Sequence, residues 1–228
     1  SSLKGAAISM NKQDAKVYAK HLGIKTTPHE TFFSWQWKED KESCLAIIEK
    51  KLTFPVWVKP CSSGSSLGIK KVFSIKEVKK AVLEAFSYDS QIIIENHIEA
   101  ILVYGSEILT LSPGEIFSQG TFHTYEGKYG QNLTPSSSKA KLEKAVEEEI
   151  KELAKKLFQS LDLACFSRID FFLTEKKEIY FNEVNPIPGL TATSLFPAIC
   201  KDSSIDEKRL IDQLIIYALY AQRTKNCI

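Results

Sequence analysis

Two short segments in the C-terminal half carry the residues best suited to chemistry. Residues 166–171 and 181–185 each alternate polar and apolar side chains with the period of a β-strand. If the two strands pair as a hairpin, Asp170, Glu183 and Asn185 meet on one surface. Two carboxylates and an amide oxygen suit Mg²⁺, which prefers oxygen ligands. A solvated outer sheet face is the alternative, but the apolar flanking residues favour a bound ion, because charges among them are costly unless paired.

A Ser- and Gly-rich segment, residues 61–68, is a second candidate. Its backbone amides and hydroxyls can surround phosphate oxygens, and Gly64 and Gly68 permit positive φ or a close approach. It is not a Walker A motif, because no Gly-Lys-Ser/Thr follows, and a plain connector is the alternative. Lys59 ends the strand before it, which reads as buried, so a phosphate would relieve the cost of an unpaired ammonium.

Other residues that could take part in binding or catalysis lie at the ends of predicted elements. Glu95 can accept a hydrogen bond from an adenine amino group or a backbone amide, or it can be a strand-end carboxylate in water. Lys12 and Lys128 bind a ligand or are surface charges. Residues 125–129 have the aromatic and polar composition of an active-site lid. The rigid segment 185–189 is suited to direct backbone amides at an oxyanion.

The elements that must position these residues alternate between helix and strand. Asn11 can cap the first helix, and Gly23 ends it. Helices are predicted at residues 11–22, 43–51, 75–86 and 139–161, with helical material ending at 223, and strands at 54–58, 69–73, 91–95, 101–104, 107–111, 165–173 and 178–185. The fold class is α/β (α+β), divided into residues 1–96 and 97–228.

Composition excludes several classes of protein. The chain is 43% hydrophobic and 25% charged with a net charge of +2, and these values do not indicate binding to nucleic acid or to membrane surfaces. No apolar run reaches the length of a membrane helix. Five scattered cysteines without a CxxC pair indicate reduced thiols in a cytoplasmic protein. The start lacks a methionine and a signal-peptide core, so we expect the chain to be part of a longer product.

Six motifs in order resemble the D-alanine–D-alanine ligase family of ATP-grasp enzymes. They are residues 9–12, 54–60, 64–68, 125–129, 167–170 and 183–191. The resemblance covers nearly the whole chain. It implies an ATP-grasp fold, in which the antiparallel sheets of two subdomains sandwich ATP, and a cytoplasmic ADP-forming ligase that makes a peptidoglycan precursor.

The resemblance also implies how the nucleotide is held. Lys12 and Lys59 would contact the phosphates of ATP, and Glu95 would face the adenine. Two Mg²⁺ (or Mn²⁺) ions bridging the β- and γ-phosphates would be held by Asp170, Glu183 and Asn185.

The implied reaction joins two D-alanines through an acyl phosphate. Lys128 would neutralise charge on the transferring phosphoryl group, and Arg168 and the backbone amide of Gly189 would stabilise the tetrahedral oxyanion. Ser194 and Leu195 would bind the carboxylate of the second D-alanine. Ser65 and Tyr129 would help to hold the active-site loops and would deprotonate or orient the second amine.

Three features depart from the family pattern. The family's N-terminal domain, which supplies an acid for the first D-alanine, is absent from the chain. Residues 97–100 run directly into the next strand without the ribose-binding glutamate, for which Glu99 is a poor substitute. Residues 130–135 form a short connection after the lid.

Several alternatives stay open. The chain resembles D-alanine–D-lactate and D-alanine–D-serine ligases in its nucleotide site, and other ATP-grasp carboxylate–amine ligases less closely. It could also be a degenerate nucleotide-binding module of a fusion protein. The partners implied by the leading interpretation are D-alanine, a second copy in a homodimer, and an N-terminal domain on the same polypeptide or a fusion.

Overall fold

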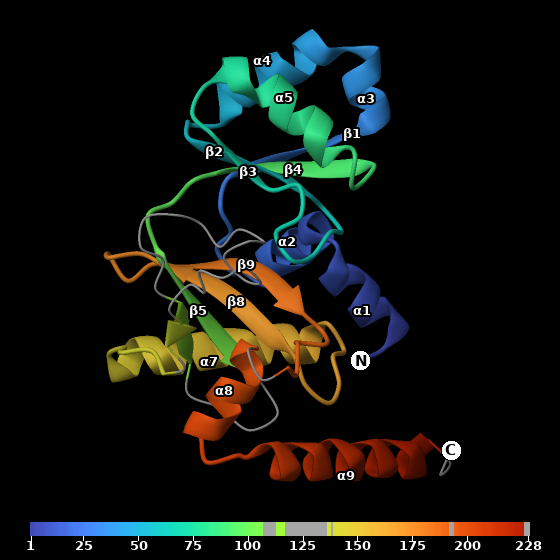
Figure 1. The fold of residues 1–228 in the computed structure, drawn as a ribbon, viewed down its shortest axis with the longest axis vertical. Coiled ribbons are helices and arrows are strands. Elements are labelled where there is room, and N and C mark those ends of the chain that lie inside the picture. The colour runs from blue at the N-terminus through green and yellow to red at the C-terminus, as the bar shows by residue number, and fades with distance from the viewer. Residues whose placement is uncertain (107–112, 117–135, 138, 192–193, 226–228) are drawn as a thin grey trace.

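Two antiparallel sheets, each backed by helices, make up the computed structural model of the chain (Figure 1). The structure describes residues 1–106, 113–116, 136–137, 139–191 and 194–225. Within these residues, the upper sheet in Figure 1 has four strands and the lower sheet has five. The mixed helix and antiparallel-sheet architecture confirms the predicted fold class.

The upper sheet has the strand order β1-β4-β2-β3, with all pairs antiparallel. Its strands are β1 (His29–Phe33), β2 (Val56–Pro60), β3 (Lys70–Val72) and β4 (Gln91–Asn96). Helices α3 (Ser34–Glu39), α4 (Lys41–Lys51) and α5 (Ile75–Ala85) cover its outer face. Alternate residues of the strands, among them Val56, Val58, Ile92 and Ile94, pack under these helices. The opposite face of the sheet is therefore turned toward the lower sheet.

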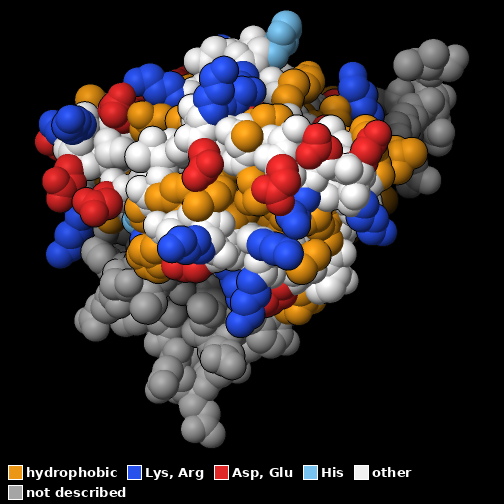
Figure 2. Space-filling model, turned by 90° about the horizontal axis from the view of Figure 1, so that it is seen from above, with side chains coloured by type: hydrophobic (Ala, Val, Ile, Leu, Met, Phe, Trp, Pro, Cys, Tyr) orange, Lys and Arg blue, Asp and Glu red, His pale blue; other side chains and the backbone are white. Residues whose placement is uncertain are grey.

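The surface seen from above carries both signs of charge. Lys and Arg side chains are interspersed with Asp and Glu on this face (Figure 2). Among the described residues, none of the helices combines the length and the apolarity needed to span a membrane.

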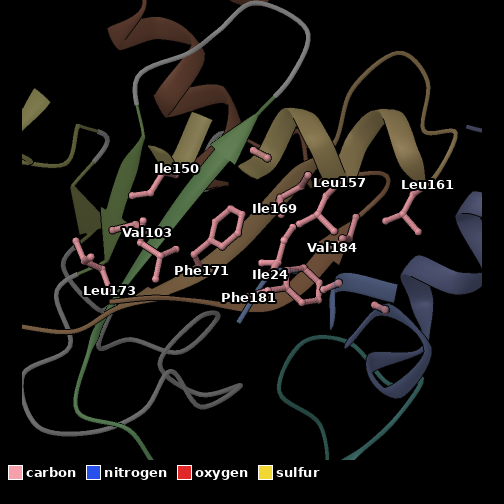
Figure 3. Close-up of a cluster of buried hydrophobic side chains, with 14 of the residues drawn as sticks. Ile24, Val103, Ile150, Leu157, Leu161, Ile169, Phe171, Leu173, Phe181 and Val184 are labelled. Atoms are coloured by element: carbon pink, nitrogen blue, oxygen red, sulfur yellow. The ribbon is translucent and has the colours of Figure 1, made fainter. Parts of the chain in front are cut away.

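The lower sheet holds the hairpin predicted to carry the metal site. Its order is β7-β6-β5-β8-β9, from β5 (Ile101–Ser106), β6 (Gly114–Ile116), β7 (Ser136–Ser137), β8 (Arg168–Leu173) and β9 (Ile179–Asn185). Helix α7 (Lys144–Ser160) packs against it through Ile150 and Leu157 (Figure 3). Phe171 and Phe181 meet edge to face in this core, with centroids 6.2 Å apart. Burying the apolar face of the hairpin sends its polar residues to the other face.

Helices from both ends of the chain complete the lower unit. Helices α1 (Leu3–Met10) and α2 (Lys12–His21) pack beside β9, and Ala15 and Ala19 of α2 share the core under α7. Helices α8 (Leu195–Asp202) and α9 (Glu207–Lys225) follow the lower sheet. The chain passes from the upper sheet to the lower sheet between β4 and β5, but the N-terminal helices α1 and α2 pack with the lower sheet. The division at 96 and 97 stays a prediction.

Most predicted elements are confirmed, with shifted ends. Asn11 caps α2 as expected, by accepting from the amides of Gln13 and Asp14. Helix α7 begins at Lys144 rather than at residue 139, because the Ala140 amide bonds to the Pro113 carbonyl at 2.8 Å. Helices α1 and α3 were not predicted, and the expected strand at 107–111 lies outside the described residues.

Candidate active site

Asp170 and Glu183 are directly opposite each other in the β8–β9 ladder, which confirms the predicted hairpin. Asp170 is only 1% exposed, and the Arg168 guanidinium holds both of its oxygens, at 2.8 and 2.9 Å. Asn185 Nδ2 donates to Asp170 Oδ2 at 3.2 Å. A register shift follows Asp170 in the ladder. Such irregularities re-aim side chains next to functional sites.

The donor set of this hairpin fits a hard divalent cation. Glu183 is 30% exposed and lies 3.9 Å from the ammonium of Lys12. Within the described residues no group of three or more His, Cys, Asp or Glu could hold a metal by itself. The hairpin instead offers two carboxylates and an amide oxygen. That set suits Mg²⁺, which completes its coordination with water and phosphate oxygens.

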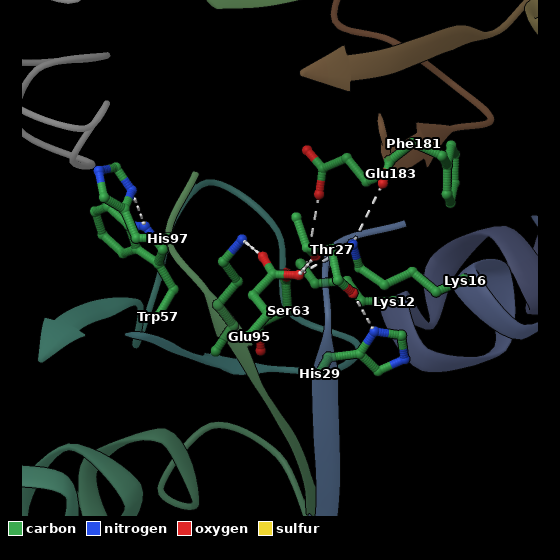
Figure 4. A network of polar contacts seen from close by, with 11 residues as sticks. Lys12, Lys16, Thr27, His29, Trp57, Ser63, Glu95, His97, Phe181 and Glu183 are labelled. Carbon is green, nitrogen blue, oxygen red and sulfur yellow. Dashed lines mark hydrogen bonds and ion pairs between the residues drawn. The ribbon is translucent and has the colours of Figure 1, made fainter. Parts of the chain in front are cut away.

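Glu95 lies at the centre of a buried charge cluster on the inner face of the upper sheet (Figure 4). Its carboxylate bonds to the ammonium of Lys59, lies 3.0 Å from that of Lys16, and accepts from Thr27 Oγ1 at 2.8 Å. Glu95 is 1% exposed, so the interpretation of a strand-end carboxylate in water is wrong. Burial opposes ionisation, but the two ammonium groups hold the pKa of Glu95 well below its usual range.

Lys16 was missed by the sequence analysis although it is fully buried. Its ammonium contacts Glu95 of the upper sheet and the Phe181 carbonyl of β9, the latter at 3.4 Å. Lys16 therefore links the two sheets from α2. One signal was available: Lys12 and Lys16 are four residues apart and so share a helix face.

Lys12 connects α2 to the Ser/Gly loop. Its ammonium donates to the Ser63 carbonyl at 2.7 Å, and its amide donates to the Cys61 carbonyl at 2.9 Å. Lys12 is 9% exposed, so it is not a surface charge. The loop therefore lies beside the same cluster as Glu183.

The Ser/Gly loop has a tight left-handed path. Ser65, Ser66 and Gly68 have φ values of 53°, 60° and 69°. A Cβ added at Gly68 would lie 2.6 Å from a Tyr88 ring carbon and 2.9 Å from Pro60 Cγ. The prediction of a positive φ or a close approach is confirmed at Gly68, and it is wrong at Gly64, where φ is not positive and an added Cβ would meet nothing within 4 Å.

The segment after β9 brings Gly189 next to Ser194. A Cβ at Gly189 would lie 2.7 Å from Ser194 Oγ, which is itself 2.8 Å from Thr191 Oγ1. The side chain of Leu195 lies outside the described residues, as do Lys128, Tyr129 and the whole predicted lid. The structure thus forms two groups of predicted residues. One group, on β8 and β9, is Arg168, Asp170, Glu183 and Asn185, and the other, on the facing sheet, is Lys59 and Glu95. Lys12 and Lys16 of α2 contact both groups or their strands.

Solved structures have the same fold. The VanG D-Ala:D-Ser ligase of Enterococcus faecalis is 31% identical with a TM-score of 0.82, over 93% of this chain and 62% of that one. A D-alanine–D-alanine ligase from Bacillus anthracis is 25% identical with a TM-score of 0.84, over 99% of this chain and 72% of that one.

Sequence comparison gives the same family. The D-alanine–D-alanine ligase of Caldicellulosiruptor bescii is 36% identical over 98% of this chain, and that of E. faecalis is 35% identical over 94%. The chain spans about 63% of the length of these relatives. The family model described as D-ala D-ala ligase C-terminus matches residues 18–216. The chain therefore belongs to the D-alanine–D-alanine ligase family, and it matches the C-terminal part of those enzymes.

Proposed function

We propose that this chain is the ATP-grasp part of an ADP-forming ligase that joins two D-alanines through an acyl phosphate. The observation that carries the proposal is the pairing of Asp170 with Glu183 across β8 and β9, with Arg168 fixed on Asp170. Two carboxylates beside a guanidinium suit phosphoryl transfer. A purely structural sheet face has no need of this set.

The metal ligands in this proposal are Asp170, Glu183 and Asn185. They would hold Mg²⁺ (or Mn²⁺), which would neutralise the β- and γ-phosphates of ATP. A B. anthracis ligase described as complexed with ATP has the same fold, with a TM-score of 0.76 at 22% identity.

Lys12 and Lys59 bind the phosphates in this proposal, and Glu95 faces the adenine. In the structure Lys59 is bonded to Glu95. When the phosphates draw Lys59 away, Lys16 and Thr27 keep the Glu95 carboxylate compensated. The cluster therefore tolerates the arrival of a polyanion without leaving a buried charge unpaired.

The remaining predicted residues serve the second half of the reaction. Arg168 and the Gly189 amide stabilise the tetrahedral oxyanion formed when the second amine attacks. Gly189 and Ser194 lie close together, which supports a single site that binds both the oxyanion and the carboxylate of the second D-alanine. We keep the proposed roles of the others as predicted: Leu195 on the second carboxylate, Lys128 on the phosphoryl group, and Ser65 with Tyr129 on the loops.

A D-alanine–D-serine ligase is the second candidate, favoured by the similarity to VanG. We further propose a cytoplasmic role in making a peptidoglycan precursor, assembly as a homodimer, and completion of the first D-alanine site by an N-terminal domain like that of the relatives.

The experiment uses the full-length protein with ATP, Mg²⁺ and either D-alanine alone or D-alanine with D-serine. Phosphate release and dipeptide formation are followed together. D-alanyl-D-alanine formed with one phosphate per dipeptide supports the main proposal, and D-alanyl-D-serine as the preferred product supports the second candidate. ATP binding without either dipeptide contradicts both and indicates a degenerate nucleotide-binding module.

A further inference from the structure

Helix α9 is attached to the lower unit near its start and then leaves it. Leu210 is buried with Phe196 and Ile199 in the small core between α8 and α9, and Leu214 is partly buried against that core. Within the described part of the chain, α8 supplies the main contact of α9. Figure 1 shows the helix extending below the lower sheet, apart from it. The C-terminal turns of α9 therefore lack the packing that holds its first turns.

The uncovered side of α9 is apolar, and we call it the α9 face. Its exposed side chains are Ile211, Ile215, Ile216, Tyr217, Leu219 and Tyr220. Three of them, spaced by four residues, form a row along the helix: Ile211, Ile215 and Leu219. Residues 213–222 contain no charged side chain. A helix that is apolar on most of its sides is normally buried, so we expect another surface to cover the α9 face in the whole protein.

The composition of the α9 face favours a protein surface as its partner. Helices that lie on membranes are rich in Lys and Arg on their polar side, and residues 213–222 have neither. Nucleic acid would require a basic surface, which is missing for the same reason. Aliphatic side chains together with tyrosines are instead typical of the buried centre of protein interfaces, where the phenolic hydroxyl can find a hydrogen-bond partner.

The longer relatives and the position of the N-terminus indicate which protein surface this is. The chain spans about 63% of the relatives' length, and the family model that it matches describes a C-terminus, so most of the remainder precedes the matched part. Ser2 is anchored on the lower unit, where its amide donates to the Asp162 carbonyl at 3.1 Å. Figure 1 shows the N-terminus and the C-terminal end of α9 on the same side of the molecule. Chain that precedes Ser1 therefore starts from the unit that carries α9, on the side toward which α9 extends.

We propose that the α9 face is the docking surface for a domain that precedes Ser1 in the full-length protein, of the kind that the longer relatives carry. Stable complexes of separate chains bury about 1,200 Å² or more, whereas interfaces between domains of one chain begin at about 600 Å². The row from Ile211 to Leu219 is one helix wide and about two turns long, which favours a tethered domain over a second copy. The inference rests on the proposed function, in which this domain completes the first D-alanine site. Docking on α9 holds the domain against the ATP-grasp part.

Photo-crosslinking in the full-length protein identifies what covers the α9 face. The photoreactive amino acid p-benzoylphenylalanine replaces Leu219, or replaces Leu83 of α5 as the matched control, since both leucines are 54% exposed. A mixture of ¹⁴N- and ¹⁵N-labelled protein distinguishes crosslinks within one copy from those between two copies. We expect position 219 to crosslink to residues before Ser1 in the same copy, and position 83 to give no such crosslink. Crosslinks from position 219 to a second copy, only to residues 1–228, or to nothing would overturn the inference.

Kinetics in the same full-length protein test what the docking does. We expect Leu219→Asp to raise the KM for D-alanine about fivefold or more, a usual size for coupling between sites, and to leave the Kd for Mg²⁺·ATP unchanged. Leu83→Asp and Leu219→Met should keep both wild-type values. An unchanged KM in Leu219→Asp, or an equal loss of ATP affinity, contradicts the inference while dipeptide formation by the wild type still supports the proposed function. Wild-type protein that gives the expected crosslinks but no dipeptide contradicts the proposed function and leaves the docking surface in place.

Discussion

The carboxylate of Glu95 lies 3.0 Å from the ammonium of Lys16, and both side chains are almost completely buried. Lys16 belongs to α2, which packs on the lower sheet, whereas Glu95 belongs to the upper one. Lys16 also contacts the Phe181 carbonyl of β9. This ion pair therefore joins the helix that packs on the lower sheet to the inner face of the upper sheet.

Replacing Lys16 removes one partner of a buried ion pair. Lys16→Met should lower the free energy of unfolding by about 1–3 kcal/mol, because the buried Glu95 carboxylate loses one of its two ammonium partners and keeps Lys59. Urea unfolding measures the change. Lys25→Met is the control: its ammonium forms an exposed pair with Glu178, 3.0 Å away, and should leave the urea midpoint unchanged. Equal midpoints for Lys16→Met and the wild type would contradict this reading of the cluster.

The ionisation of Glu95 should persist in acid. The folded pKa of Glu95 lies below the ordinary 4.5, so its stabilising contribution is present above 4.5 and is lost as the pH falls toward the folded pKa. In protein labelled with ¹³C at Glu carboxyls, one resonance should remain ionised at about pH 3, where ordinary glutamates are protonated. Its absence in Glu95→Gln assigns it. Titration of that resonance at or above 4.5 would refute the prediction.

Gly68 and Gly64 make a matched pair in the Ser/Gly loop. Gly68→Ala forces a Cβ against Pro60 and Tyr88 at a φ of +69°, whereas a Cβ at Gly64 meets nothing within 4 Å. We expect Gly68→Ala to lower the free energy of unfolding by about 1–3 kcal/mol. Gly64→Ala should change it by less than about 1 kcal/mol. Equal effects in a denaturation series would show that the loop does not have this path.

The buried thiol of Cys61 should resist alkylation. Burial raises the pKa of Cys61 from 9.0 to about 12, and only the thiolate reacts. Iodoacetamide at about pH 8, the lower side of the ordinary thiol range, should modify Cys61 only after unfolding. Cys200, whose pKa burial raises to about 11, should behave alike. Mass spectrometry of native and urea-treated samples reads the result, and fast native labelling at Cys61 would contradict it.

The hairpin and its polar face could be predicted because their information is local. Period-two alternation in two adjacent strands predicted that Asp170, Glu183 and Asn185 share one surface if the strands pair, and the strands do pair, with Asp170 opposite Glu183. The role of Lys16 could not be predicted in this way, because its contact with the Phe181 carbonyl joins residues 165 positions apart. Only the packing of α2 against β9 makes that lysine buried.

Helix ends show the same limit. Helix α1 is short, and Gly5 packs so closely on the C-terminal end of α7 that an added Cβ would lie 2.1 Å from the Leu161 carbonyl. Strand β8 begins at Arg168 instead of residue 165, because Cys165 adopts a φ of +67°, outside strand geometry. Neither the tertiary contact nor the backbone turn leaves a periodic signal in the sequence.

The proposed metal site is tested most directly by comparing Glu183→Gln with Glu178→Gln in the full-length protein. Glu183 is the proposed metal ligand near the C-terminal end of β9, while Glu178 precedes that strand and pairs with Lys25 on the surface. The assay follows dipeptide and phosphate formation from ATP and D-alanine over a range of Mg²⁺ concentrations. We expect Glu183→Gln to lose activity at least about a hundredfold, while Glu178→Gln keeps wild-type activity and Mg²⁺ dependence. Full activity of Glu183→Gln with an unchanged Mg²⁺ requirement would contradict the assignment of this hairpin as the metal site of a ligase.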